Sequence, residues 1–208
     1  MELFTAIVRD GEEYHAGQFL PAIEQFALGE RFDMDILMRI PALLEQNELP
    51  ALAINLTAGA LRSDGFRLWL IDYMNAHQQV SQQITFEIAE SILVQYGDEM
   101  ESLCEAIHRY GFSFGVDQYG RHIQSLDYLA RLRPAYVKVD FGYTAQVLQE
   151  EADTQFLAAI CRVARNLGIH TIAQRIETIE QVERLQEFYI DGYQGYIDPP
   201  VKLSEDKH

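Results

Sequence analysis

The sequence has no long apolar run and only two cysteines. No hydrophobic stretch approaches the roughly 18 residues that a membrane-spanning helix needs, and the chain does not open with the basic and then apolar pattern of a secretory signal peptide. Cys104 and Cys161 fall in separate helical patterns, without the CxxC spacing of a metal or redox site. We therefore expect a cytoplasmic protein with two buried thiols.

Positive charge is scarce. The chain carries 16 Lys and Arg residues against 32 Asp and Glu residues, for a formal net charge of −16. With no basic stripe to neutralise phosphates, a nucleic-acid polymer is excluded as the partner. A small anionic nucleotide is still compatible, if local cations or a divalent metal hold it. We expect the acids at 87–105 and 150–153 to lie largely on solvated helix faces.

Glycine-rich phosphate loops are also absent, since no strand is followed by a GxGxxG or Walker pattern. Instead, short apolar strands start near residues 51, 84, 112, 136, 169 and 190 and alternate with helical patterns. This spacing is typical of successive βα units with a parallel sheet. With an opening strand at 2–8, the chain has seven strands where a closed (β/α)8 barrel has eight. We predict an α/β fold of the TIM-like barrel type that lacks its first N-terminal strand, with an open doubly wound sheet as the alternative.

Apolar residues at three- and four-residue spacing predict the helices. They are expected at 19–28, 32–44, 61–76, 91–110, 123–131, 154–167 and 179–188. Gly111 and Gly168 stand where the fourth and sixth intervals need a C-terminal cap or stop. We expect a loop at 10–17, and a single domain over 1–208 that ends in a disordered tail at 201–208.

Polar side chains recur at the ends of the predicted strands. The stretch Gly111–Gly120 is the clearest case, because its apolar strand runs directly into Asp117 and Gln118. A polar side chain in an apolar strand costs a few kcal/mol unless it is satisfied. We therefore expect one shared site at the mouth of the barrel. The other members of the set are Asn55, Glu87, Lys138, Asp140, Gln174 and Gln194.

Several collinear motifs together resemble one family. They are Ala-Ile-Asn55-Leu-Thr, Phe-Glu87-Ile-Ala-Glu90-Ser, Val-Asp117-Gln-Tyr-Gly-Arg, Val-Lys138-Val-Asp140 and Ile-Glu177-Thr. In this order and spacing they resemble the EAL domain, a family that hydrolyses the bacterial second messenger cyclic di-GMP. Gly17-Gln-Phe-Leu-Pro21 is similar to the segment that follows the family's name motif. The resemblance covers essentially the whole chain except the family's first strand, so it implies an N-terminally truncated EAL domain.

The resemblance implies a two-metal phosphodiesterase site, in which oxygen ligands hold Mg²⁺ or Mn²⁺ and the metals generate the attacking hydroxide. Glu2, Asn55, Glu87 and Asp117 stand at metal-ligand positions of the family. Lys138 stands where the family positions the attacking water. Supporting positions are matched by Glu90, Glu177 and Gln194.

Three positions depart from the family pattern. Gln118 replaces the second of two paired Asp residues, and Gln174, followed by Arg175, replaces a Glu. Ala6 stands where the family has an Arg that grips the nucleotide. A neutral amide cannot bridge two dications as a carboxylate does, so the losses remove several kcal/mol of metal and transition-state binding. The pattern is similar to that of degenerate EAL modules in LapD-type receptors, which bind cyclic di-GMP without cutting it.

We therefore predict a catalytically inactive receptor module that needs no cofactor, with Glu2, Lys138, Gln118 and Gln174 as relics of catalysis. The predicted nucleotide contacts are Asn55, Glu87, Asp117, Lys138, Asp140, Glu177 and Gln194. One alternative is a residual phosphodiesterase that uses Mg²⁺ or Mn²⁺, and another is a protein-interaction scaffold that no longer binds the nucleotide. By resemblance we expect a homodimer, with upstream signalling domains that could anchor the module on the cytoplasmic side of a membrane.

Some of these residues have simpler structural interpretations. Lys138 and Asp140 lie two residues apart on one strand face and could form an internal ion pair. Glu177 could be an acid of a helix's first turn, where the helix dipole favours it. Tyr119 could stack on a guanine, but a place in the core is favoured.

Overall fold

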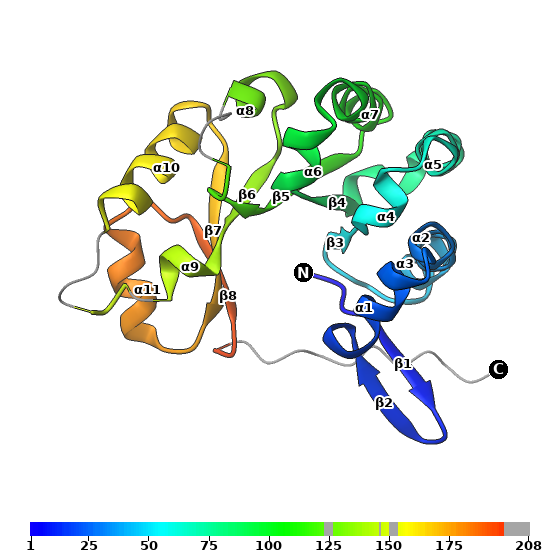
Figure 1. Ribbon diagram of the computed structural model, residues 1–208, viewed down its shortest axis with the longest axis horizontal. Coiled ribbons are helices and arrows are strands. Elements are labelled where there is room, and N and C mark those ends of the chain that lie inside the picture. The colour runs from blue at the N-terminus through cyan, green and yellow to red at the C-terminus, as the bar shows by residue number, and fades with distance from the viewer. Residues whose placement is uncertain (123–126, 146, 150–153, 198–208) are drawn as a thin grey trace. The chain divides into compact units, whose positions relative to one another are not determined.

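The computed structural model describes residues 1–122, 127–145, 147–149 and 154–197. The chain divides into two compact units. The N-terminal unit comprises Met1–Asp117 and Arg121–Ala135, and the C-terminal unit comprises Gln118–Gly120 and Tyr136–His208. Each unit contains parallel strands with helices between them, which is the α/β class predicted from the sequence (Figure 1).

The N-terminal unit is built on three parallel strands. They are β3 (Leu52–Asn55), β4 (Ile84–Ala89) and β5 (Ser113–Tyr119), in that order across the sheet. The helical segments between and after them are α4 (Ala58–Leu61), α5 (Asp64–Ala76), the 3-10 helix η1 (Gln78–Gln83), α6 (Glu90–Gln95), α7 (Gly97–Arg109) and α8 (Asp127–Leu132). The last residues of β5, Gln118 and Tyr119, belong to the C-terminal unit. Residues 123–126, where the α8 pattern was expected to begin, lie outside the described residues.

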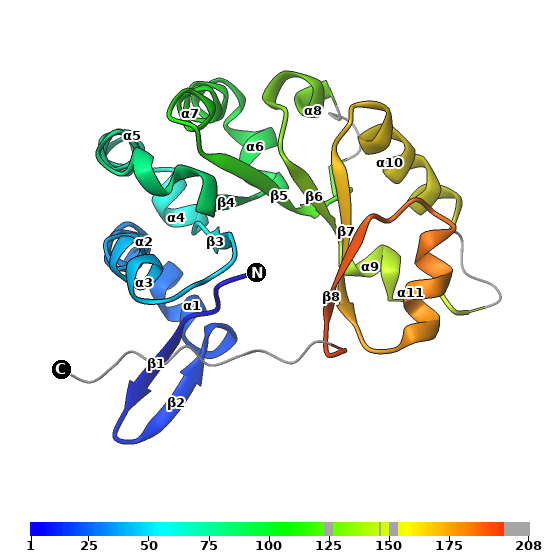
Figure 2. The same cartoon turned by 180° about the vertical axis from the view of Figure 1, so that it is seen from behind.

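The opening segment differs from the prediction of one strand at 2–8 and a loop at 10–17. Only Glu2 joins the sheet, through a parallel bridge to Ala53, while β1 (Ala6–Arg9) and β2 (Glu12–His15) form an antiparallel hairpin. Figure 2 shows this hairpin extending beside α1 (Ala16–Gln25). Asp10 and Gly11 make the turn with φ of 54° and 83°. An Asp-Gly pair suits a turn that needs two positive φ values, and this signal outweighs the loop-like composition.

Three predicted helices are each two helices in the structure. The interval 32–44 contains α2 (Gly29–Leu37) and α3 (Ile40–Gln46), and Pro41 lies in the first turn of α3. Proline favours a helix start, because its missing N–H is not needed there. The interval 61–76 breaks where the Ser63 hydroxyl accepts a hydrogen bond from the N–H of Phe66 and caps α5. The interval 91–110 breaks at Tyr96, between α6 and α7.

In its described residues the C-terminal unit also has three parallel strands. They are β6 (Tyr136–Val139), β7 (His170–Ile176) and β8 (Gly192–Gly195). Its helices are α9 (Phe141–Thr144), α10 (Gln155–Asn166) and α11 (Ile179–Gln186). The short α9 was not predicted, and β7 runs two residues past the predicted end at Gln174. The acids at 150–153 and the expected tail lie outside the described residues.

Predictions about the core are confirmed within each unit. Cys104 and Cys161 are free thiols with 1% and 0% exposure. Tyr119 is fully buried, and its hydroxyl donates a 3.0 Å hydrogen bond to the carbonyl of Ile160, so this ring is a core residue. Gly111 follows α7 in the left-handed conformation that the predicted cap requires, with φ of 81°. In the part of the chain that the structure describes, every helix is too short or too polar to cross a membrane.

Candidate functional site

The N-terminal unit brings four predicted site residues onto one face of its sheet. Asn55 pairs in register with Glu87, and Glu87 pairs with Gly115, two residues before Asp117. Glu2 pairs with Ala53, two residues before Asn55. Side chains at paired positions, and at positions two apart along a strand, point to the same side of a sheet. Glu2, Asn55, Glu87 and Asp117 therefore share one face, near the carboxyl ends of the parallel strands.

Glu2 is fixed beside Asn55 by both backbone and side chain. The N–H of Leu3 donates to the carbonyl of Ala53 at 2.9 Å, and the N–H of Ala53 donates to the carbonyl of Met1 at 2.8 Å. The amide Nδ2 of Asn55 then donates a 2.6 Å hydrogen bond to Oε1 of Glu2. Because Nδ2 is turned toward Glu2, the amide group of Asn55 has a defined orientation.

Two carboxylates on or next to β4 are buried. Glu87 is 1% exposed, and Glu90, the first residue of α6, is fully buried. Glu90 accepts hydrogen bonds from the hydroxyl of Tyr128 and from the backbone N–H of His122, both at 2.9 Å. Glu90 thus ties α6 to the segment that follows β5 and to α8.

The donor types on this face fit a hard divalent cation, since carboxylate and amide oxygens are the ligands that Mg²⁺ and Mn²⁺ prefer. Among the described residues, however, no group of three or more His, Cys, Asp or Glu side chains is close enough to hold a metal ion. The four residues therefore agree with a metal site in their chemistry, but they are not gathered into one in this conformation.

The C-terminal unit places Lys138 and Asp140 at the carboxyl end of β6. Both side chains are largely buried, at 4% and 9% exposure. The Oδ1 of Asp140 accepts a 2.9 Å hydrogen bond from the N–H of Gly142 and so caps α9. Its own N–H donates to the carbonyl of Tyr119 at 3.0 Å. Asp140 therefore has a structural task in addition to the predicted nucleotide contact.

Three glutamines occupy predicted positions in the C-terminal unit. Gln174 and Gln194 each follow the registered pair Ala173–Tyr193 by one residue, and both are half-buried. Gln118 adopts φ of 56°, a left-handed conformation that is uncommon for a residue other than glycine. At Gln118, which the sequence analysis predicts to stand in place of a family carboxylate, the backbone therefore departs from regular strand geometry.

Glu177 lies just before α11 rather than in its first turn, so its interpretation as a first-turn acid is wrong. Thr178 is the N-cap, and its hydroxyl accepts a hydrogen bond from the N–H of Gln181 while the Gln181 side chain accepts from Thr178 and Glu177. The first-turn acid is Glu180, whose pKa is lowered by hydrogen bonds to its backbone and to Thr178. The exposed carboxylate of Glu177 is thus not needed for the helix cap.

One buried acid was not identified from the sequence. Asp33 of α2 is 1% exposed, and its Oδ2 accepts hydrogen bonds from the N–H and the hydroxyl of Thr57, at 2.7 and 3.0 Å. Burial raises the pKa of Asp33 to about 7, against the lowering effect of the Thr57 hydrogen bonds and with a smaller raising effect from Glu24. A signal existed, because Asp33 is the middle residue of the buried stripe Gly29–Asp33–Leu37.

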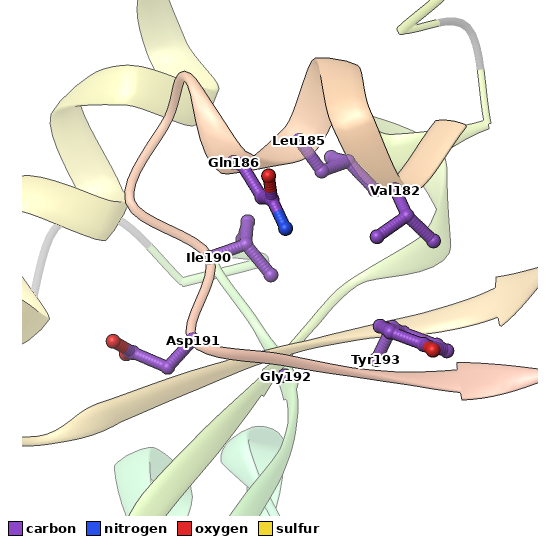
Figure 3. Close-up of a pocket in the computed structure, with 7 residues that line it drawn as sticks. All are labelled: Val182, Leu185, Gln186, Ile190, Asp191, Gly192 and Tyr193. Carbon is purple, nitrogen blue, oxygen red and sulfur yellow. The ribbon is translucent and has the colours of Figure 1, made fainter. Parts of the chain in front are cut away.

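Two cavities among the described residues are lined by none of the predicted site residues. One, of about 130 Å³, lies between α11 and β8 in the C-terminal unit, and Figure 3 shows Leu185, Ile190 and Tyr193 among its lining side chains. The other, of about 210 Å³, lies in the N-terminal unit beside the ion pair of Arg62 and Glu24. Both are smaller than the roughly 300 Å³ at which ligand pockets usually begin.

Comparison with known proteins identifies the class of protein. The family model of the EAL domain matches residues 1–200, and the chain belongs to this family. The family assignment supports the predicted α/β architecture of the TIM-like EAL type and shows the resemblance inferred from the motifs to be right.

Particular relatives include both enzymes and binding proteins. The chain is 30% identical, over 196 residues, to the cyclic di-GMP phosphodiesterase PdeB of Shewanella oneidensis, covering 90% of this chain and 22% of PdeB. It is also similar to an S helix-GGDEF-EAL structure of Vibrio cholerae LapD, at 38% identity in the apo form and 40% in the form bound to cyclic di-GMP. For both LapD structures the TM-score is 0.88, with coverage of 94% of this chain and 48% of the solved LapD chain. The chain thus spans less than half the length of these relatives.

A metal-containing structure is also among the similar ones. A Klebsiella pneumoniae BlrP1 complex with manganese and cyclic di-GMP is 27% identical, with a TM-score of 0.68, and the match covers 84% of this chain and 47% of BlrP1. A protein that is similar to this chain therefore has a structure in which the nucleotide is accompanied by a divalent metal.

Proposed function

We propose that this EAL domain binds cyclic di-GMP as a receptor or effector module and does not hydrolyse it. The observation that carries the proposal is the similarity to LapD in its cyclic di-GMP-bound form, at 40% identity and a TM-score of 0.88. Loss of carboxylates at Gln118 and Gln174 supports binding without hydrolysis, because a neutral amide gives a metal pair no charge to bridge.

The proposed contacts with the nucleotide are polar groups, assigned separately within each unit. In the N-terminal unit we assign Asn55, Glu87 and Asp117, which share one sheet face. A carboxylate can accept hydrogen bonds from the N–H groups of a guanine, and the oriented amide of Asn55 adds an acceptor of fixed direction. The residues that we assign in the C-terminal unit are Lys138, Asp140, Glu177 and Gln194.

A residual phosphodiesterase is the second candidate. Its support is the similarity to PdeB and the retention of Glu2, Asn55, Glu87 and Asp117, whose oxygens suit Mg²⁺ or Mn²⁺. In that case these residues would hold the metal, which would supply the activated water, and Lys138 would orient that water. In the receptor function no metal is needed.

A receptor must also pass on the information that its ligand is bound. Binding can do this only if the ligand has a higher affinity for one conformation of the receptor than for another. We propose that the chain acts as the cytoplasmic output module of a longer signalling protein. We further propose that residues 1–208 form a single EAL domain and that this domain is a homodimer. The relatives' greater length supports the presence of further domains in such proteins.

Titration calorimetry of the purified chain with cyclic di-GMP tests the proposal. We expect micromolar or tighter binding that is the same with Mg²⁺, with Mn²⁺ and with EDTA, and we expect chromatography to recover intact nucleotide. Metal-dependent cleavage would establish the phosphodiesterase instead. Absence of binding under all conditions would reject both functions and leave the protein-interaction scaffold.

A further inference from the structure

Arg175 of the C-terminal unit stacks on an aromatic ring at the carboxyl ends of two neighbouring strands. Its guanidinium carbon lies 5.0 Å from the ring centroid of Phe141. Arg175 directly follows Gln174 near the end of β7, and Phe141 directly follows Asp140 after β6. Both side chains are exposed, Phe141 at 37%. The pair is therefore a solvent-accessible cation beside two residues of the candidate site.

The backbone at Arg175 is held in an unfavourable conformation. Its φ is 56°, a value that suits glycine and disfavours a residue with a Cβ atom. The pairing of β7 with β8 shifts register between Ala173 and Ile176, so Arg175 lies in a bulge. Gly195 of β8 lies so close that an added Cβ would meet the Ile176 backbone at 2.1 Å. Bulges commonly redirect a side chain, and here the redirected side chain is the one over Phe141.

The platform under Arg175 is well fixed. Asp140 caps α9 through the N–H of Gly142, and the hydroxyl of Tyr143 in α9 donates a 2.9 Å hydrogen bond to the carbonyl of Gly120. The ring of Tyr143 also packs against Phe156, with centroids 4.7 Å apart. These contacts fix the short helix that presents Phe141, and the stack on Phe141 restricts the guanidinium before any ligand arrives, which lowers the entropy lost on binding.

The guanidinium keeps its hydrogen-bonding capacity. Among the described residues, its contact is the ring face of Phe141, and no carboxylate there pairs with it. Other arginines of this acidic chain do pair with carboxylates, as Arg131 does with Glu101 at 2.7 Å. Stacking occupies one face of the guanidinium plane, while its five N–H donors lie in the plane and suit two oxygens of one phosphate.

We propose that Arg175, stacked on Phe141, binds a phosphate of cyclic di-GMP through a bidentate contact. This inference rests on the proposed function and adds to it a residue that was predicted only as a departure from the family pattern. A fixed guanidinium compensates phosphate charge without a divalent ion. It therefore gives a physical reason for binding that is independent of metal.

The matched control is a second stacked arginine in the same unit. The guanidinium carbon of Arg165 lies 4.2 Å from the ring centroid of Tyr189. Arg165 is in the last turn of α10, and Tyr189 precedes β8, so this pair lies toward the amino ends of β7 and β8. It has the same chemistry as the Arg175–Phe141 pair but lies at the other end of the strands.

The experiment is calorimetric titration of the full chain and its variants with cyclic di-GMP, at low and high salt. Arg175→Gln should raise the Kd at least tenfold and flatten its salt dependence, since it removes a charged donor pair. The Kd of Arg175→Lys should lie between those of Arg175→Gln and the unchanged protein, because lysine keeps the positive charge but cannot donate two parallel hydrogen bonds to one phosphate. Phe141→Leu should raise the Kd severalfold, and Arg165→Gln should leave it unchanged.

Arg175→Gly separates binding from folding, because glycine accepts a φ of 56° without strain. It should lose affinity like Arg175→Gln while its thermal unfolding midpoint is equal to or above that of the unchanged protein. If the unchanged protein binds and Arg175→Gln binds equally well, the inference is wrong and the proposed function stands. Equal losses in Arg165→Gln would also overturn it. If the unchanged protein does not bind cyclic di-GMP, both the proposed function and this inference are wrong.

Discussion

Asn55 and Glu2, separated by 53 positions in the chain, are joined by a 2.6 Å hydrogen bond from Nδ2 to Oε1. In the proposed receptor, Glu2 contributes to nucleotide binding indirectly, because its carboxylate orients the side-chain amide of Asn55 rather than contacting a metal. A polar partner that is correctly oriented before binding loses less freedom when the ligand arrives. The relationship thus assigns a present role to a residue that the sequence suggested only as a relic of catalysis.

The first prediction separates these two roles. Asn55→Ala should weaken cyclic di-GMP binding about tenfold, the usual scale for one lost hydrogen bond to a polar ligand. Glu2→Ala should weaken it less, and the double variant should bind like Asn55→Ala alone. Calorimetric Kd values for the four proteins measure the coupling directly. Additive losses would mean that Glu2 contacts the ligand or a metal by itself.

A second prediction concerns the missing carboxylates. Gln118→Asp combined with Gln174→Glu should create Mn²⁺-dependent cleavage of cyclic di-GMP, because it restores two anionic oxygen ligands. Gln118 has φ of 56°, and aspartate tolerates this region better than most residues, so the fold should accept the change. The readout is the linear dinucleotide product, separated by chromatography.

The control for this restoration is Gln118→Asn alone, which has the shape of the introduced aspartate without its charge, because the Gln174 already present has the shape of glutamate. It should produce no cleavage with Mn²⁺. If the carboxylate variant still binds cyclic di-GMP but does not cut it, then the inactivity cannot be assigned to these two positions.

The sequence predicted the strands better than the helices, and the reason is physical. Most of the parallel strands are short apolar runs with a polar residue at or near the carboxyl end, and local composition carries this pattern almost completely. The helix breaks at 38–39, 62–63 and 96 depend on capping and on how the next helix packs, and apolar periodicity continues across them. The Asp10–Gly11 hairpin was missed although its turn signal is strong, because the flanking strands are exposed and show no clear alternation.

Candidate-site residues could be predicted from the sequence where a polar side chain at the end of a strand was itself the signal. Asn55, Glu87 and Asp117 share a sheet face because strand register places them there, as expected from polar residues at the ends of parallel strands. The stack of Arg175 on Phe141 was not predictable, because it needs a bulge and an unpredicted short helix. Asp33 was missed because a single acid in an apolar stripe is usually a surface residue.

Asp33 leads to a third prediction, on pH. Its pKa is raised from 3.8 to about 7 in the folded protein, so the folded state holds a proton that the unfolded state releases above about pH 4. The favourable contribution of Asp33 to the free energy of unfolding is therefore complete below about pH 4 and is lost as the pH rises to about 7. A shift of this size corresponds to a loss of at most about 4 kcal/mol.

Asp33→Asn should remove this loss, because asparagine resembles the protonated acid and can still accept the Thr57 hydrogen bonds. The variant should match the unchanged protein near pH 4 and exceed it in unfolding free energy at pH 8, as measured by urea denaturation. The control is Asp35→Asn, an exposed acid on the same helix, which should leave the pH dependence unaltered. Parallel pH curves for Asp33→Asn and the unchanged protein would show that Asp33 is not the titrating group.

The fourth prediction uses the two thiols to report on the two units separately. Burial raises the pKa of Cys104 and of Cys161 to about 12, with smaller raising effects from Glu101 and Asp191. The thiolate is the reactive form, so neither thiol should react with DTNB at pH 8 until its own unit opens. Cys104 belongs to the N-terminal unit and Cys161 to the C-terminal unit. Cys104→Ala and Cys161→Ala variants therefore leave one reporter each, and labelling in increasing urea follows the opening of each unit.

Rapid labelling of either remaining thiol in the absence of urea would contradict the burial of that thiol. If the units open independently, the two variants should label at different urea concentrations, and cyclic di-GMP should slow labelling in any unit that contacts it.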